Sequence, residues 1–219
     1  MSDTDDTEGY RINNSISSDK KKLLSELNIK NNDEMIKKDA IELISDLFNN
    51  ICEENKKKNE KNNRLIKYFI SNNIPSISIK DYLFRLIKLT QINLSTIILI
   101  LIYIDRICNI NHIFLTYYNI HKLILSSFIV ASKYNEDYYY SMIFYSKLGG
   151  VTIGELNLLE SKFLLLIRYN LYVHVNLYEK YYNDLMSLKS DNEEEYENES
   201  DEDEEGSNDI IENNNIINS

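Results

Sequence analysis

The sequence predicts an all-α fold. The chain has 219 residues and is 43% hydrophobic, yet it contains only five glycines, one proline and no tryptophan. Sandwiches and barrels need frequent turn residues, so this shortage favours helices. A chain of this length can build one sizeable core. We place that core in residues 74–188, because both ends of the chain are poor in core-forming residues.

The first third of the chain predicts one helix between two polar segments. Residues 1–32 are polar and lack periodicity, which predicts disorder. Residues 33–73 are expected to hold a helix and a linker, because residues 35–54 carry one apolar stripe at helical spacing. The stripe consists of Ile36, Ala40, Leu43, Ile44, Leu47, Phe48 and Ile51. We expect this amphipathic helix to pack on the folded domain that follows the charged linker.

Five helices are predicted in the domain, with a sixth after them. They lie at residues 78–90, 94–109, 117–134, 138–147, 153–168 and 177–188. Ser78 with Asp81, and Thr152 with Glu155, have the spacing of a capping box at a helix start. Thr116 is the expected cap of the third helix.

The third of these helices is expected to be central. It carries four small residues among large aliphatic ones, namely Ser126, Ser127, Ala131 and Ser132. Small side chains allow neighbouring helices to approach closely, which a helix surrounded by others requires.

The charge of the chain is concentrated in its last segment. The formal net charge is −11, and residues 191–212 contain 13 acidic residues and no basic one. Residues 189–219 are therefore predicted to be a disordered, acidic, asparagine-rich tail. The rest of the chain is near neutral, which argues against a nucleic-acid-binding surface.

The cysteines and the longest apolar run indicate an intracellular protein. Cys52 and Cys108 lie far apart and lack metal-ligand spacing, as is typical of reduced thiols. The longest apolar run, residues 94–104, is about half as long as a membrane span and reads as a buried helix. The N-terminal residues are polar and do not resemble a secretory signal. We expect a location in the nucleus or the cytoplasm, and no membrane partner.

Four separated segments give the domain a family resemblance. In chain order they are Ser78–Leu89, Tyr103–Arg106, Ala131–Tyr134 and Leu156–Glu160. As an ordered set they resemble the cyclin box, in the form carried by the P/U-type cyclins of phosphate signalling. Three further stretches continue the P/U-type pattern: Ile77–Leu83, Asn119–Leu123 and Gly149–Val151.

This resemblance implies both an architecture and a function. The architecture is a single five-helix cyclin box, here with an additional N-terminal amphipathic helix. The implied function is that of a non-catalytic regulatory subunit, which binds and activates a cyclin-dependent serine/threonine protein kinase.

The resemblance also implies a kinase-binding site. In cyclins, the lysine that ends the third helix and a glutamate in the fifth bond to the backbone of the kinase's regulatory helix. The matching residues are Lys133 and Glu160. Four more residues are assigned to the same surface: His121, Lys122, Glu136 and Asp137. The alternatives are a helix-terminal charge at Lys133, a solvated glutamate at Glu160 and a packing histidine at His121.

Four charged residues are assigned structural roles. Asp81 is expected to belong to a helix cap. Asp105 follows an apolar run and is expected to pair with Arg85 or Arg106, because a buried charge needs a partner.

Two other functional classes compete with a kinase regulator. An enzyme is disfavoured because the three histidines lack metal-ligand spacing, and no glycine-rich phosphate loop or Ser/His/Asp order is present. The second is a transcription-factor-type cyclin fold that acts as a nucleic-acid or protein-binding adaptor. Such proteins usually carry two boxes and a basic face, whereas this chain shows one box near neutral charge. We therefore expect no cofactor, no metal and no bound nucleic acid.

Overall fold

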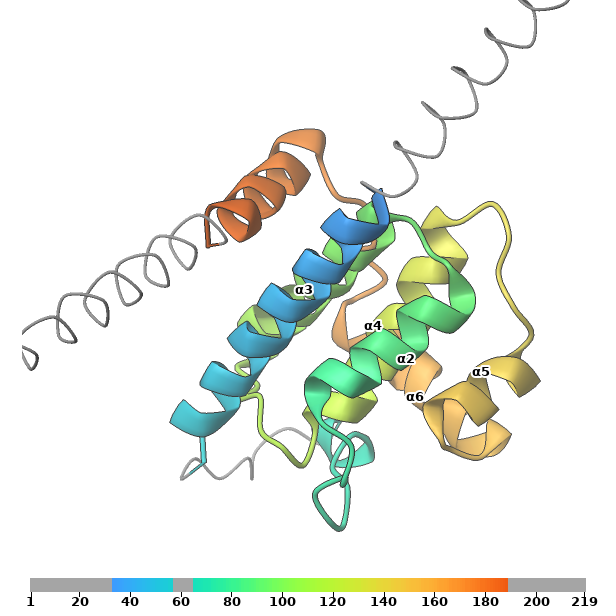
Figure 1. Cartoon of the computed structure of the whole chain (residues 1–219). Helices are drawn as coiled ribbons and strands as arrows, with labels where there is room; N and C mark the ends of the chain where they lie inside the picture. The colour runs from blue at the N-terminus through green and yellow to red at the C-terminus, as the bar shows by residue number, and fades with distance from the viewer. Residues whose placement is uncertain (1–32, 57–64, 189–219) are drawn as a thin grey trace, which may run out of the picture. The chain divides into compact units, whose positions relative to one another are not determined.

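The computed structural model describes residues 33–56 and 65–188 (Figure 1). The chain divides into two compact units, 1–39 and 40–219, and the description below concerns the second. The expectations of disorder for the two ends fall outside the described residues. Within the described ranges every regular element is a helix, which confirms the all-α prediction.

The elements follow the predicted order closely. They are η1 (Ile66–Tyr68), α2 (Ile79–Thr90), α3 (Leu94–Asn111), α4 (Ile120–Asn135), α5 (Met142–Gly149) and α6 (Ile153–Leu166). Two further helices span residues 33–54 and 175–188, and we call the second the C-terminal helix. The largest differences from the predicted bounds are at the starts of α4 and α5.

Side-chain caps fix the starts of three helices. The Ser78 hydroxyl accepts a hydrogen bond from the Asp81 N–H at 3.0 Å and donates to the Asp81 carboxylate at 2.7 Å, as the capping-box spacing predicts. Thr152 caps α6 by accepting from the Glu155 N–H at 3.2 Å. Helix α5 starts later than predicted because Ser141 is its cap, accepting from the Phe144 N–H at 3.3 Å.

The predicted cap of α4 is wrong. Helix α4 begins at Ile120, and Asn119 is its N-cap residue. Thr116 lies in the preceding turn, where its N–H donates to the Asn119 side-chain oxygen at 2.9 Å. The Asn119 amide donates to the Phe114 carbonyl at 2.9 Å, so this asparagine holds the turn together before the helix starts.

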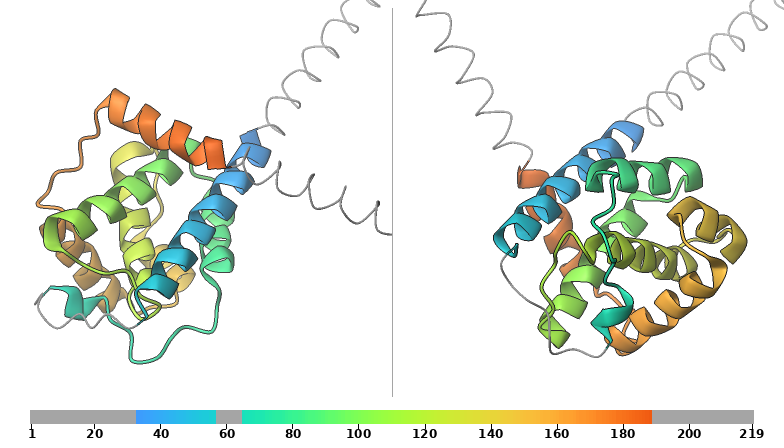
Figure 2. Two further views of the ribbon diagram at one scale, coloured as in Figure 1. Left: turned by 90° about the vertical axis from the view of Figure 1, so that its left-hand side faces the viewer. Right: turned by 90° about the horizontal axis from the view of Figure 1, so that it is seen from below.

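Helix α4 is the central helix of the domain, as the small residues predict. It packs against α2, α3 and α6. Figure 2 shows it enclosed by the other helices. Ser126, Ser127, Ala131 and Ser132 are all buried. The Ser127 hydroxyl donates to the Ile100 carbonyl of α3 at 3.0 Å, so a polar group is satisfied where the two helices meet closely.

Helix α3 owes its apolar composition to the same packing. In the described part of the chain it is the one helix with the length and composition of a membrane span, but more than half of it is buried inside the bundle. Tyr103, at its middle, is fully buried and donates its hydroxyl to the Leu171 carbonyl at 2.8 Å. The packing of α3 against α4 and α6 therefore explains why this helix is so apolar, and contact with a membrane is not needed to explain it.

Residues 40–56 pack on the helices of the box, as predicted for the amphipathic stripe. Ala40, Ile44, Phe48 and Cys52 are buried in the same core as α3 and α4. Polar contacts hold the end of this stretch, because the Asn55 amide donates to the Leu115 carbonyl at 3.1 Å. The stretch is therefore part of the folded domain.

We predict that Phe48→Ala destabilises the domain by about 3–5 kcal/mol, because a fully buried aromatic ring leaves a cavity when it is truncated. Urea unfolding followed by circular dichroism would measure the change. Asn50→Ala, at an exposed position of the same helix, is the control and should change stability by less than about 0.5 kcal/mol. Equal stability of the two variants would mean that this stretch does not contribute to the core.

Candidate functional site

The two principal site residues meet where α4 packs on α6. Lys133 lies in the last turn of α4, and its Nζ donates to Oε1 of Glu160 in α6 at 2.6 Å. Their side chains are 28% and 19% exposed. An ion pair at the surface contributes only about 0–1 kcal/mol, so opening it costs little. The site thus presents a donor and an acceptor side by side on rigid helices.

A second ion pair joins the same two helices. Lys122, near the start of α4, lies 2.9 Å from the Glu155 carboxylate in the first turn of α6. The capping-box spacing had predicted that Glu155 would reach back towards Thr152, but its carboxylate meets this lysine instead. Both ends of α4 are therefore linked to α6 by charges that remain partly exposed.

His121 is placed in the packing and not on the surface. It is only 6% exposed, and its Nε2 lies 3.0 Å from the Ile77 carbonyl. Its ring meets the Tyr82 ring edge-on, with 5.2 Å between the centroids. Burial lowers the pKa of His121 below its ordinary value of 6.5. The imidazole therefore packs against Ile77 and Tyr82, and the assignment of His121 to a partner-binding surface stays a prediction that this burial does not favour.

Glu136 has a structural role that the sequence did not indicate. Its carboxylate accepts hydrogen bonds from the Asn93 N–H at 2.8 Å and from the Asn93 amide at 2.7 Å, and also from the Thr96 hydroxyl. Glu136 therefore caps the start of α3 from the end of α4, where a negative charge favours the helix dipole.

Asp137 follows Glu136 and is exposed. Both residues line a hollow of about 480 Å³ together with Tyr138, Tyr139, Tyr140 and residues 90–93. Tyr138 is 93% exposed, so its ring is available to a partner. This hollow adjoins the end of α4 and lies close in sequence to Lys133.

The structure confirms the predicted role of Asp81 and corrects that of Asp105. Asp81 belongs to the α2 cap as predicted. Asp105, however, pairs with neither arginine. Its Oδ2 accepts from the Tyr181 hydroxyl at 2.5 Å and from the Asn109 amide at 2.9 Å. Consecutive residues on a helix point in different directions, so Asp105 and Arg106 face different neighbours.

The two arginines have other contacts. Arg106 donates to the Asn170 carbonyl at 2.6 Å and to the Tyr172 carbonyl at 3.2 Å, and so holds the segment after α6. Arg85 lies over the Tyr82 ring, 5.2 Å from its centroid. Both arginines therefore stabilise the fold, but not through Asp105.

Comparison with known proteins agrees with this architecture. A protein-family model described as Cyclin matches residues 20–171. The chain belongs to the cyclin family. It is 31% identical over 149 residues to Cyclin-U2-1 of Arabidopsis thaliana, which covers 65% of this chain and 67% of that protein.

Two further relatives are also named as cyclins or cyclin-like proteins. Cyclin-U2-2 of Arabidopsis thaliana is 37% identical over 109 residues, which is 49% of this chain and 47% of that protein. PHO85 cyclin-like protein psl1 of Schizosaccharomyces pombe is 35% identical over 130 residues, which is 58% of this chain and 54% of that protein. The match spans about half of these two relatives. Together the names confirm the resemblance to P/U-type cyclins, and cyclins are non-catalytic regulatory subunits of protein kinases.

Two features of this cyclin were not found from the sequence. The cap that Glu136 places on α3 joins residues 43 positions apart, and the Tyr181–Asp105 bond joins residues 76 positions apart. Neither pair has a local spacing signal. Asp105 did stand out as a charge after an apolar run, but its partner lies on the C-terminal helix and could be identified only in the folded chain.

The cap predicts a difference between two neighbouring acids. Glu136→Ala should destabilise the cyclin by about 1–3 kcal/mol, because the Asn93 N–H loses its partner at the start of α3. Asp137→Ala is the matched control. Asp137 is exposed and makes no hydrogen bond or ion pair with the described residues, so its loss should have little effect on stability. Thermal unfolding of both variants measures this, and equal melting temperatures would contradict the capping role.

Burial of His121 predicts a pH dependence. In the unfolded chain this imidazole takes up a proton near its ordinary pKa of 6.5, whereas in the folded chain its pKa is lower. The unfolded state therefore binds more protons as the pH falls, and stability should decrease from about pH 7 to pH 5. The His121→Gln variant should lose less stability than the wild type between pH 7 and pH 5. The His174→Gln variant, changed at an exposed position, should lose as much stability as the wild type. Denaturant unfolding at each pH would measure it, and identical slopes in all three proteins would contradict the assignment.

Proposed function

We propose that this cyclin binds and activates a cyclin-dependent serine/threonine protein kinase, with Lys133 and Glu160 as the central contact. The observation that carries the proposal is the partly exposed ion pair between them, 2.6 Å long, at the junction of α4 and α6. Lysine is a hydrogen-bond donor and glutamate an acceptor. Side by side, they match a backbone carbonyl and an N–H of a partner helix.

The chemistry of activation follows from differential affinity. A partner shifts a kinase towards its active conformation only if it binds that conformation more tightly than the inactive one. Charges held on packed helices have a fixed position, so they can bond to the kinase backbone in only one arrangement. Lys133 and Glu160 neutralise each other in the free cyclin, so neither charge of this pair is left without a partner before the kinase binds.

Exposed side chains on α4, α5 and α6 support a protein interface on this part of the box. Tyr134, next to Lys133, is half exposed. Ile153 is also exposed, and it lies seven residues before Glu160, on the same face of α6. Ile143 of α5 is exposed as well. Exposed apolar and aromatic side chains on helices that carry a charged pair, and on a neighbouring helix, are typical of partner surfaces.

The names of two relatives point to the kinase. The psl1 protein is named as a PHO85 cyclin-like protein, and PHO85 cyclin-7 of Saccharomyces cerevisiae is 32% identical over 135 residues. These names support an intracellular kinase of the PHO85 type as the partner of this chain. Asp137 and the tyrosines beside it would extend the contact from the end of α4.

Variants of the ion pair can distinguish an effect on kinase binding from an effect on the stability of the cyclin. Lys133→Ala and Glu160→Ala should each weaken kinase binding by about 2–5 kcal/mol and reduce kinase activation in parallel, with little change in melting temperature. The double exchange Lys133→Glu with Glu160→Lys keeps an ion pair within the cyclin but reverses the charges offered to the kinase. It should fold normally and fail to activate. Titration calorimetry and a kinase assay with a PHO85-type kinase would measure both effects.

Matched controls come from the C-terminal helix. Lys180→Ala and Glu179→Ala remove one lysine and one glutamate at exposed positions and should leave activation intact. Full activation by the folded charge-exchanged variant would disprove the proposed contact. Loss of folding in either single variant would show that the pair acts within the cyclin.

A further inference from the structure

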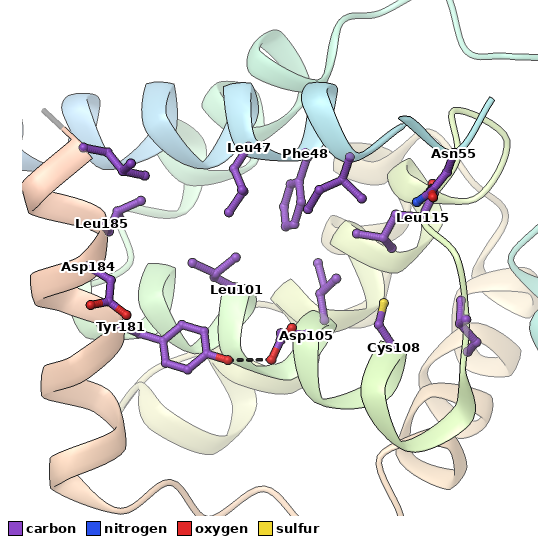
Figure 3. A pocket seen from close by; sticks show the side chains of 14 residues that line it. Leu47, Phe48, Asn55, Leu101, Asp105, Cys108, Leu115, Tyr181, Asp184 and Leu185 are labelled. Atoms are coloured by element: carbon purple, nitrogen blue, oxygen red, sulfur yellow. Dashed lines mark hydrogen bonds between the residues drawn. The ribbon is translucent and has the colours of Figure 1, made fainter. Parts of the chain in front are cut away.

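A second site lies away from the α4–α6 junction, in the pocket shown in Figure 3. Its volume is about 420 Å³, and four parts of the chain form it: the end of the 33–54 helix with the turn after it, α3, the segment that follows α3, and the C-terminal helix. The walls are mainly aliphatic and aromatic, with Leu47, Phe48, Leu101, Leu115 and Leu185 among them. Pockets of about 300–1,000 Å³ with apolar walls and a few polar groups are typical of small-molecule sites.

Two of the polar residues that line this pocket are acidic. Asp105 and Asp184 both line it, whereas no lysine or arginine does. None of the ion pairs in the described ranges involves either carboxylate. In Figure 3 both acids lie beside Tyr181, on the two helices that face each other across the pocket. The pocket is therefore bordered by a partly buried carboxylate, Asp105, and an exposed one, Asp184, with no cationic side chain among its lining residues.

The geometry of Asp105 leaves part of its carboxylate available. Both of its hydrogen bonds, from Tyr181 and from Asn109, end on Oδ2. A carboxylate can accept bonds on both oxygens, so Oδ1 retains its capacity. The Tyr181 bond also fixes the rotamer of Asp105, which orients the carboxylate for a ligand.

We propose that this pocket binds a small molecule with an apolar body and a cationic amine. The amine bonds to Oδ1 of Asp105 and lies near Asp184, and the body occupies the space between Leu47, Leu101 and Leu185. A charge-assisted hydrogen bond is stronger than a neutral one, so the amine determines the selectivity while the apolar walls supply most of the affinity.

A series of three probes tests the proposal on the full-length wild-type chain. The probes are 4-phenylbutylamine, the neutral 4-phenylbutan-1-ol and the anionic 4-phenylbutyrate, which share one apolar body. The amine should bind saturably below about 1 mM, at least about tenfold more tightly than the alcohol, and the carboxylate should bind most weakly. Titration calorimetry gives the affinities. In methyl NMR spectra the signals of Leu47 and Leu185 should shift with the amine.

Variants locate the charge recognition. Asp105→Asn keeps the shape of the side chain and should reduce amine affinity about tenfold, to that of the alcohol. Glu179→Gln, on the same helix as Asp184 but outside the pocket, should bind the amine as wild type does. The proposal is overturned if amine and alcohol bind equally to the wild type, if no probe saturates at millimolar concentration, or if the folded Asp105→Asn variant keeps full amine affinity.

Discussion

Burial of α4 on all sides is the constraint on which the rest of the domain depends. Twelve of its 16 residues are buried, and four of these have small side chains that let α3 and α6 approach closely. A helix so enclosed has one position relative to its neighbours, because close-packed interiors do not deform gradually. The Ser127 hydroxyl, which this close approach would otherwise bury without a partner, donates to the Ile100 carbonyl of α3. The remaining elements are arranged around this helix.

The charges at the ends of α4 follow from that burial. Lys122 and Lys133 lie where the helix reaches the surface, and each meets a glutamate of α6. Since both helices are rigid, a partner that bonds to these groups does not have to order them first, which lowers the entropic cost of binding. Each ion pair contributes little free energy, so it orients the two side chains but can open when a partner binds. In the proposed complex, the core keeps the site rigid and the charges at the ends of α4 select the partner.

The sequence predicted the fold well because its signals were local. Helical spacing gave the stripe of residues 35–54, Ser78 and Thr152 marked helix starts, and small residues marked α4 as central. It could not identify contacts between distant residues. The cap that Glu136 places on α3 was not predicted, and Asp105 was expected to pair with an arginine although its partner is Tyr181. His121 carried the spacing of a family motif, but its burial depends on how α2 packs against α4, which no local pattern reveals.

The most direct test of the account is hydrogen–deuterium exchange of this cyclin with and without a PHO85-type kinase, read by mass spectrometry. The account predicts slower exchange on binding in peptides that cover residues 131–138 and 153–161, at the junction of α4 and α6. Peptides from the C-terminal helix, residues 175–188, should exchange as in the free protein. Slower exchange confined to the C-terminal helix, with the two junction peptides unchanged, would contradict the claim that the ends of α4 and α6 form the kinase-binding site.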